Sequence, residues 1–253
     1  MALSHRLHGA YRRKDAMLHG IDISNWQKGM EVPERVDFCI VKATEGFRYV
    51  DPCCDGFVQQ CISKGIRWGF YHFARNNEPE QEAQFFWENT KGYVSKGIPV
   101  LDIEDDRIGD WGAYSQRFID KYHAITGVYP IVYCSAAYLS RFNGYPLVDT
   151  CGLWVAGYPS AAQRSVKDVP KFPYKISPWK FAAIWQFSNN GWIDSWDEPV
   201  DVDVAYMDNR AWDLYATCGD KEASEVTTQW PSIGDKKEWT LKGDGIEVSV
   251  KLS

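Results

Sequence analysis

The sequence predicts an α/β fold, an irregular TIM-like barrel of five β/α units followed by three strands, with a short C-terminal β appendage. Three observations predict this fold class. Short apolar runs alternate with longer amphipathic segments, which is typical of a parallel sheet with right-handed crossover helices. Eight such runs lie before residue 207, and eight strands can close into a barrel. Beyond residue 218 the composition becomes polar and a hairpin signal follows.

Clear helices follow the predicted strands only in the first five units. The run VDFCIVKA is apolar on both faces, as in a parallel sheet that is covered on both sides. The helix expected over 54–64 stops at Gly65, a residue suited to the left-handed conformation at a helix end. The helix that begins at Pro79 opens with proline and acids, which favour a helix N-terminus. The predicted strands are 19–24, 36–43, 66–74, 98–104, 129–135, 151–158, 181–188 and 199–206, and the helices are 54–64, 79–94, 110–126, a short one ending near 142, and 207–217.

These elements divide the chain into three expected segments. Residues 1–18 form an N-terminal lead-in, 19–218 the barrel, and 219–253 a β-hairpin appendage around Gly243-Asp244-Gly245. The lead-in carries charge but no apolar stretch, so we expect no signal peptide and synthesis in the cytoplasm. No apolar run reaches the roughly 18 residues of a membrane helix, so we expect no membrane insertion.

Composition excludes several function classes. Aromatic residues make up 15% of the chain, which rules out an intrinsically disordered protein. The net charge of −6 argues against nucleic acid as a partner, because phosphate binding requires a basic surface. The seven cysteines form no CxxC motif and several lie in apolar runs, which favours buried thiols in a reducing compartment. The histidines show no ligand spacing with them, so we expect neither a metal nor a cofactor.

Acidic side chains gather where the predicted strands end. Asp102 and Glu104 in LDIE are separated by one residue, which on a strand places both on one face, roughly 6–7 Å apart. Two carboxylates that close resist joint ionisation, so one keeps its proton nearer neutral pH. Asp22 ends the first strand and Asp201 lies on the eighth, its neighbour in a closed barrel. Active sites of such barrels form at the carboxyl ends of the strands, so these four acids can converge there. For any single acid, capping of the following turn explains the position equally well.

The sequence resembles that of a known family, glycoside hydrolase family 25, which comprises the Chalaropsis-type lysozymes or N-acetylmuramidases. The motifs that carry the resemblance run in order from residue 19 to about 217: HGIDISNWQ, VDFCIVKATEG, GFYHFA, PVLDIED, YPIVYCS, LWVAGY, AAIWQFS and VDVDVAYMD. The resemblance implies a barrel of five β/α units and three strands. It also implies hydrolysis of the β-1,4 bond between N-acetylmuramic acid and N-acetylglucosamine in peptidoglycan.

The resemblance assigns roles to the acidic residues by position. Glu104 matches the general acid, and Asp102 matches its partner, which acts as nucleophile or as helper to the substrate's acetamido group. Asp22 matches the acid of the first strand. On the last strand the family usually has Asn where Asp203 stands, so Asp201 is the preferred site acid and Asp203 the alternative.

Other strand-end residues are expected to bind substrate. Lys42 and Glu45 in KATEG predict a salt link that faces the cavity, whereas His72 is expected to be structural. Aromatic rings at strand ends are suited to stacking on sugar faces, and core packing is the competing interpretation, nearly as strong for Trp154. The expected substrate-binding residues are Lys42, Glu45, Tyr71, Tyr133, Trp154, Tyr158, Gln186 and Asp203.

The sequence therefore predicts a lysozyme whose partner is bacterial peptidoglycan, such as a phage endolysin that reaches the wall after holin-type release. A non-catalytic cell-wall glycan-binding barrel is the alternative from another class, and it would be preferred if one acid of the LDIE pair were missing. A glycosidase for another polymer, such as chitin, is a third hypothesis. For the C-terminal hairpin three roles remain open: binding wall polymer, self-association, or packing on the barrel.

Overall fold

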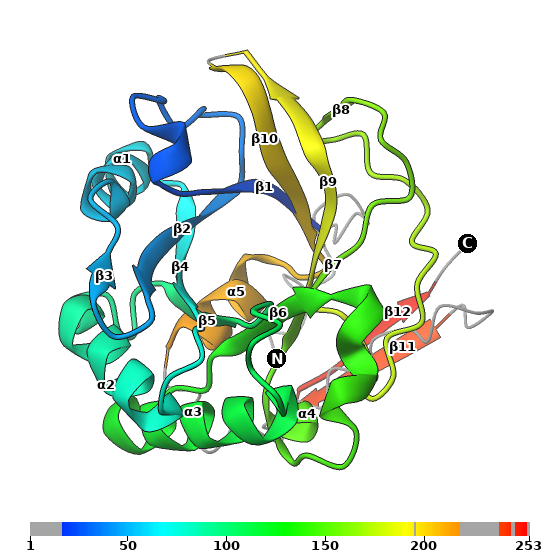
Figure 1. Ribbon diagram of the computed structural model, residues 1–253. Coiled ribbons are helices and arrows are strands. Elements are labelled where there is room, and N and C mark those ends of the chain that lie inside the picture. The colour runs from blue at the N-terminus through cyan, green and yellow to red at the C-terminus, as the bar shows by residue number, and fades with distance from the viewer. Residues whose placement is uncertain (1–16, 195, 218–237, 244–245, 252–253) are drawn as a thin grey trace, which may run out of the picture.

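Eight strands close into a barrel in the computed structural model of the protein, which describes residues 17–194, 196–217, 238–243 and 246–251 (Figure 1). Around the ring the order is β1 (Leu18–Ile23), β2 (Phe38–Glu45), β4 (Arg67–Phe73), β5 (Ile98–Asp102), β6 (Ile131–Ser135), β7 (Leu153–Ala156), β9 (Ile184–Ile193) and β10 (Trp196–Ala205). β1 pairs with both β2 and β10 and so closes the ring. The prediction of an eight-stranded α/β barrel is confirmed.

The predicted parallel sheet is wrong at one strand. β10 runs antiparallel to both of its neighbours, β1 and β9, whereas the other neighbouring barrel strands pair in parallel. The reason is the connection: β9 ends at Ile193 and β10 begins at Trp196, which leaves no room for the crossover that a parallel pair needs. As a consequence, the middle of β10, not its end, lies level with the carboxyl ends of the parallel strands, and Asp201 pairs with Asp22 there.

Helices cover the outside of the barrel, as Figure 1 shows. They are α1 (Cys54–Lys64), α2 (Pro79–Thr90), α3 (Trp111–Thr126) and α4 (Leu147–Thr150), whereas α5 (Asn209–Ala216) lies across one end of the barrel. α1 has the predicted bounds and ends at Gly65, whose φ of 66° is left-handed. The regular five-unit description holds only in part, because 3-10 turns at Asn25–Gln27 and Ala136–Phe142 follow β1 and β6.

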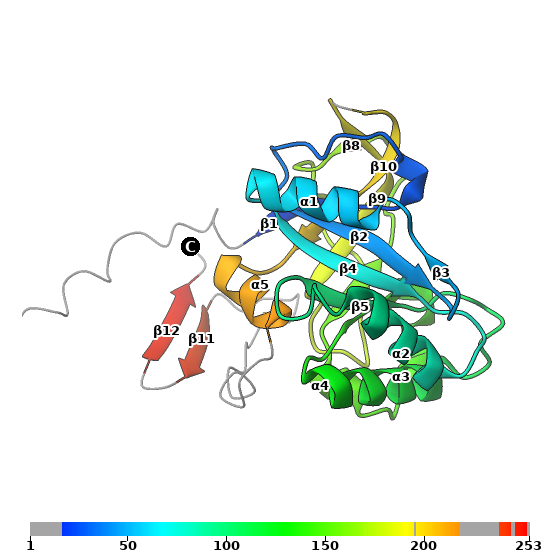
Figure 2. The ribbon, with the colours of Figure 1, turned by 90° about the vertical axis from the view of Figure 1, so that its left-hand side faces the viewer.

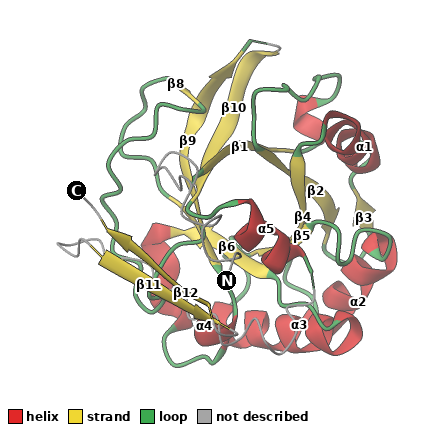
Figure 3. Cartoon of the chain, turned by 180° about the vertical axis from the view of Figure 1, so that it is seen from behind, coloured by secondary structure: helices red, strands yellow, loops and turns green. Residues whose placement is uncertain are grey.

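The barrel strands alternate between two buried faces. On β2, Phe38 and Ile40 belong to the cluster inside the barrel, whereas Cys39 and Val41 belong to the larger cluster that packs under the helices. α5 closes the amino end of the barrel, where the rings of Trp212 and Phe38 lie 4.8 Å apart. Seen from behind, α5 crosses the middle of the strand ring (Figure 3). The inward side chains at the opposite end are therefore the ones that a substrate can reach.

Four short strands complete the described structure. β3 (Tyr49–Val50) pairs with the end of β2, and β8 (Arg164–Ser165) pairs with β9. β11 (Glu238–Gly243) and β12 (Ile246–Lys251) pair with each other in antiparallel fashion, as Figure 2 shows. The turn residues Asp244 and Gly245, the segment 218–237 and most of the lead-in 1–18 lie outside the described residues. The domain boundaries and the role of the hairpin stay predictions.

The described cysteines are free thiols. Cys39, Cys54, Cys61, Cys134 and Cys151 are buried and Cys53 is half-buried, whereas Cys218 lies outside the described residues. Burial raises the pKa of the thiols of Cys39, Cys54, Cys134 and Cys151, that of Cys54 to about 12, so these four stay protonated and pack as small apolar groups. Within the described part of the chain, no helix is both long and apolar enough to cross a membrane.

Candidate active site

Strand register brings five carboxyl groups to the carboxyl end of the barrel. Asp22 pairs directly with Asp201 across β1 and β10, and Asp203 lies two residues deeper, opposite Gly20. Asp102 is the last residue of β5, and Glu104 follows two residues later. Glu104 is close enough to raise the pKa of Asp22, Asp102 and Asp201. We call this group the carboxyl cluster: Asp22, Asp102, Glu104, Asp201 and Asp203.

Gln186 holds Asp22 in place. The Gln186 Nε2–H donates to Asp22 Oδ2 at 2.6 Å, and Gln186 Oε1 accepts hydrogen bonds from the hydroxyls of Tyr133 at 3.0 Å and Tyr158 at 2.6 Å. Burial raises the pKa of Asp22 to about 6, and the hydrogen bond from Gln186 limits that rise. The structure thus joins Gln186, Tyr133 and Tyr158, all expected at the site, to the first-strand acid.

Asp203 is the deepest member of the carboxyl cluster. It is fully buried, and its Oδ1 accepts a 2.8 Å hydrogen bond from the indole N–H of Trp154. Its Oδ2 has no hydrogen-bond partner among the described residues unless a proton lies between it and Asp22. Burial, the larger cause, and the nearby Asp22 raise the pKa of Asp203 well above its ordinary value, so this carboxyl keeps its proton to higher pH than an ordinary aspartate. A protonated Asp203 has the same charge as the Asn expected there from the resemblance.

Asp201 lies nearer the opening than Asp203. It is half-buried, and burial together with the charges of Asp22 and Glu104 raises its pKa to about 8. Because β10 runs antiparallel to β1, Asp201, which precedes Asp203 in the chain, lies nearer the open end of the barrel. This placement supports Asp201 as the last-strand acid that a substrate meets.

Asp102 and Glu104 form a pair in which Asp102 is buried and Glu104 is exposed. Asp102 is only 6% exposed, and its Oδ1 has no hydrogen-bond partner within the described structure. Burial first, and then the charge of Glu104, raise its pKa well above the ordinary range. Glu104 is an exposed residue, but the surrounding protein removes part of the water from its carboxyl group and so raises its pKa. The charges of Lys42 and Arg75 act in the opposite direction. The pair therefore offers an accessible proton donor above a buried carboxyl group.

The predicted salt link between Lys42 and Glu45 is present beside the carboxyl cluster. Lys42 Nζ lies 2.6 Å from Glu45 Oε2 and 4.8 Å from the centre of the Phe73 ring. Glu45 Oε1 in turn accepts hydrogen bonds from Arg75 Nε at 2.8 Å and Nη2 at 2.6 Å. The charges of Lys42 and Arg75 act against the rise in the pKa of both Asp102 and Glu104.

Sequence reasoning missed Arg75 and its partner Asp105. Arg75 Nη1 donates to Asp105 Oδ2 at 3.3 Å, and Arg107 also donates to both oxygens of Asp105. These hydrogen bonds hold the pKa of Asp105 well below its usual range. The signal that would have found both residues is position, because each directly follows a predicted strand, 66–74 or 98–104.

The predicted aromatic residues fall into two groups. Tyr133 and Trp154 are 8% and 2% exposed, and their rings pack edge to face at 4.6 Å inside the barrel. For Trp154 the expected sugar stacking is replaced by the competing interpretation, core packing, to which the structure adds the hydrogen bond to Asp203. Tyr71 is half-buried near Asp102, and Tyr158 is 39% exposed, so these two rings are open to a ligand. Trp26, just beyond β1, is 84% exposed and was not singled out from the sequence.

His72 has the structural role that was expected. It is fully buried, with Nδ1 2.8 Å from Thr44 Oγ1 and Nε2 2.8 Å from Glu82 Oε2. Glu82 also accepts from the backbone N–H of Arg75 and from Asn77 Nδ2, so this buried carboxylate fixes the loop that carries Arg75. Over the described ranges, no group of three His, Cys, Asp or Glu side chains is arranged to hold a metal ion.

Comparisons with known proteins point to one family. The family model described as glycosyl hydrolases family 25 matches residues 21–196. The N,O-diacetylmuramidase of Chalaropsis sp is 29% identical over 196 residues, which cover 68% of this chain and 88% of that protein. The lysozyme of Streptococcus phage Cp-1 is 32% identical over 190 residues, 71% of this chain and 50% of that protein.

A solved structure has the same barrel. The family GH25 lysozyme from Aspergillus fumigatus superposes with a TM-score of 0.64 at 26% sequence identity, covering 79% of this chain and 99% of that one. The match of the family model extends from β1 to the start of β10 and includes Asp22, Asp102 and Glu104. Because that model matches more than half of the chain, the protein belongs to glycosyl hydrolase family 25.

Proposed function

We propose that the protein is a lysozyme, an N-acetylmuramidase that hydrolyses the β-1,4 bond between N-acetylmuramic acid and N-acetylglucosamine in bacterial peptidoglycan. The observation that carries the proposal is the carboxyl cluster, in which the pKa values of Asp22, Asp102, Glu104, Asp201 and Asp203 are all raised. Glycoside hydrolysis needs a proton donor at the leaving oxygen and negative charge near a developing oxocarbenium ion. A barrel of this family with such a cluster at its open end can supply both.

Glu104 acts as the general acid in this proposal. Its exposed position lets the glycosidic oxygen approach, and its raised pKa keeps it protonated closer to neutral pH than an ordinary glutamate. Asp102, below it, faces the anomeric side as nucleophile or as the group that orients the substrate's acetamido oxygen. Removal of a proton from Asp102 is favoured by the nearby charges of Lys42 and Arg75.

Asp22 and Asp201 orient the substrate in the mechanism we propose. Asp22, whose pKa is the lower of the two at about 6, also adds negative field at neutral pH. Asp22 is held by Gln186, and Asp201 lies directly beside it on β10. Asp203, which is buried and hydrogen-bonded to Trp154, acts on substrate only through Asp22, which it contacts. Tyr71 and Tyr158 provide ring surface for the sugars next to these carboxyl groups.

Muropeptide analysis after digestion of purified peptidoglycan tests the activity. New reducing ends on muramic acid support the proposal, whereas ends on glucosamine indicate a different glycosidase. Binding of glycan without any new ends indicates the non-catalytic glycan-binding barrel.

The Glu104→Gln variant tests the assigned acid. We expect kcat to fall by about 10²- to 10⁴-fold, because glutamine cannot donate the proton to the leaving oxygen. The Glu88→Gln variant is the matched control, since Glu88 is exposed on α2 at the outside of the barrel. Full activity of Glu104→Gln in purified, folded protein contradicts the role of Glu104.

We also propose that this activity serves host-cell lysis after holin-type release, which the similarity to a phage lysozyme supports. The test is expression in a susceptible bacterium with and without a co-expressed holin, followed by culture turbidity. Rapid clearing that requires the holin supports the route. Clearing of equal speed without a holin contradicts it.

A further inference from the structure

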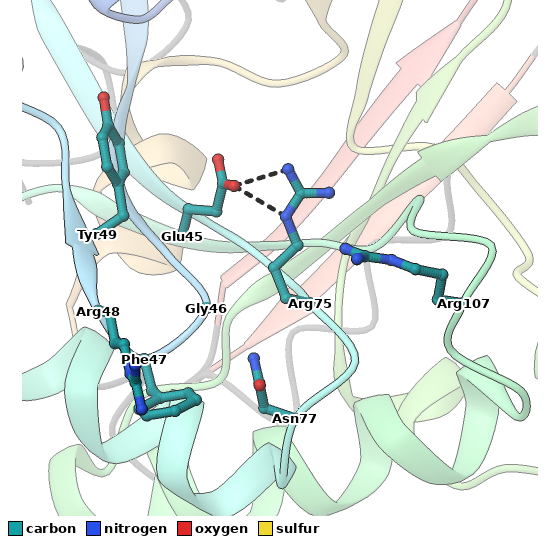
Figure 4. A pocket seen from close by; sticks show the side chains of 8 residues that line it. All are labelled: Glu45, Gly46, Phe47, Arg48, Tyr49, Arg75, Asn77 and Arg107. Atoms are coloured by element: carbon teal, nitrogen blue, oxygen red, sulfur yellow. Dashed lines mark hydrogen bonds and ion pairs between the residues drawn. The ribbon is translucent and has the colours of Figure 1, made fainter.

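A positively charged pocket lies beside the carboxyl cluster, and no step of the mechanism above places a ligand in it. It has a volume of about 440 Å³. Three arginines, Arg48, Arg75 and Arg107, together with Asn77, line it around the segment 46–49, as Figure 4 shows. We call it the arginine pocket.

Strand register places the arginine pocket next to the reacting end of the barrel. Glu45 on β2 pairs with Phe73 on β4, and Phe73 pairs with Asp102 on β5. The pocket arginines come shortly after these three strand ends: Arg48 lies three residues after Glu45, Arg75 two after Phe73, and Arg107 five after Asp102. A ligand that occupies the barrel mouth at Asp102 can therefore extend into the pocket without leaving the protein surface.

The charges of the arginine pocket are not fully used within the described structure. Glu45 is the one acidic residue among those that line the pocket, and it is already engaged by Lys42 and Arg75. Arg107 pairs with Asp105 while its side chain is 67% exposed. Arg48 is exposed and lies over the Phe47 ring at 4.7 Å, with no hydrogen bond or ion pair to another described residue. Guanidinium groups held in this way are suited to a carboxylate.

The pocket also has apolar walls. Tyr49 is 36% exposed, and Phe47 is half-buried under the guanidinium of Arg48. Asn77 is held by Glu82, which leaves the shape of the pocket floor defined before any ligand arrives. The combination of arginine donors and aromatic rings fits a short peptide that carries a carboxylate better than a bare sugar.

We propose that the arginine pocket binds a carboxylate of the stem peptide attached to the muramic acid residue of the glycan that occupies the mouth. The proposal rests on the function proposed above. In peptidoglycan the stem peptide is the carboxylate-bearing group linked directly to the sugar whose bond is cut, so it lies within reach of a pocket adjoining Asp102. The protein as a whole has a net charge of −6, which repels an anionic wall at long range. The pocket supplies attraction at short range and makes peptide-bearing glycan the preferred substrate.

The test compares three soluble substrates of equal glycan length. The first carries stem peptides, the second has lost them through an amidase that cleaves between muramic acid and the peptide, and the third carries peptides whose carboxyl groups are chemically amidated. We expect wild-type kcat/KM to be highest for the first. Replacing Arg48 in the Arg48→Gln variant should lower kcat/KM about five- to tenfold on the first substrate only, because one charge-assisted contact is lost. Arg107→Gln should act in the same direction.

Charge-matched controls separate a local from a general effect. Arg67→Gln and Arg210→Gln remove arginines from the amino end of the barrel, at the start of β4 and on α5, so their effect on all three substrates should be equal. Each variant is checked for an unchanged melting temperature. Because Arg48 has no ion pair to another described residue, its replacement should not unfold the protein.

The outcomes distinguish the two proposals. If wild type cleaves none of the substrates, the proposed function fails. If wild type cleaves all three equally well, or if Arg48→Gln and Arg107→Gln lower the rates on all substrates equally, the arginine pocket does not recognise the stem peptide. The soluble substrates contain no phosphate polymers. If the arginine variants lower the rate only on whole walls that contain such polymers, the pocket responds to phosphate and the proposal is overturned.

Discussion

Asp22 is predicted to make the native protein less stable at neutral pH. The side chain is 8% exposed, and burial raises its pKa from the ordinary 3.8 to about 6. Between these values the native state holds a proton that the unfolded chain has lost. The stabilising contribution of neutral Asp22 is therefore complete below about pH 3.8 and is lost as the pH rises through about 6. At pH 7 the ionised native carboxylate costs about 3 kcal/mol relative to the unfolded chain.

The Asp22→Asn variant removes this cost while it keeps the local contacts. The amide oxygen of the introduced side chain still accepts the hydrogen bond from Gln186, and its N–H can donate to the oxygen of Asp203 that has no partner among the described residues. We expect the free energy of unfolding to rise by up to about 3 kcal/mol at pH 7. At pH 4, where Asp22 is neutral in the native state, the gain should be below about 1 kcal/mol.

Urea unfolding followed by tryptophan fluorescence measures the change at both pH values. Asp197→Asn is the matched control, because Asp197 is exposed on β10, and it should show no such gain. The reasoning is refuted if Asp22→Asn is less stable than wild type at pH 7, or if its gain is the same at pH 4. Activity should fall in the same variant, which would show that the site carboxyl is retained for function at a cost in stability.

Two further predictions concern the groups around the carboxyl cluster. Lys42→Met removes a charge that lowers the pKa of Asp102 and Glu104, so both limbs of the pH profile of kcat/KM should move to higher pH. Glu82→Ala leaves His72 and the N–H of Arg75 without their buried acceptor, so the free energy of unfolding in urea should fall by about 3–5 kcal/mol.

Each of these variants has a control and a contradicting outcome. For Lys42→Met the control is Lys91→Met, at the exposed end of α2, and a profile that stays in place contradicts the charge argument. For Glu82→Ala the control is Glu82→Gln, which keeps an acceptor oxygen and should lose clearly less stability. Equal losses for the two Glu82 variants would mean that the hydrogen bonds are not the cause.

Local sequence pattern was sufficient for most elements of the fold. The eight barrel strands lie close to their predicted ranges, and α1 has the predicted bounds, because period-two alternation, apolar runs and Gly65 act over a few residues. Pattern did not reveal the direction of β10, since a strand has the same alternation in either direction. Its orientation depends on the short connection between Ile193 and Trp196, whereas the predicted strands 181–188 and 199–206 leave ten residues between them.

In the candidate active site, too, local sequence pattern predicted some features and the tertiary structure decided others. Acids at strand ends could be found from sequence alone, because a strand of known direction delivers its last residues to the barrel mouth, and this rule predicted Asp22, Asp102 and Glu104. The order of Asp201 and Asp203 required the antiparallel register of β10, which places Asp203 deeper. The raised pKa of Asp203 follows from its full burial beside Asp22, which cannot be read from the sequence.

The arrangement of the arginines at the open end of the barrel depends on the tertiary structure. Arg75 and Asp105 each follow a predicted strand in the sequence, but they meet each other and Arg107 only because β2, β4 and β5 end side by side. Short-range pattern thus specifies which segments form strands and which end in acids, since those preferences depend on neighbouring residues. Which charges face one another, how deeply each is buried and hence which carboxyl keeps its proton depend on closure of the barrel, because burial and Coulomb interactions act between residues that are distant along the chain.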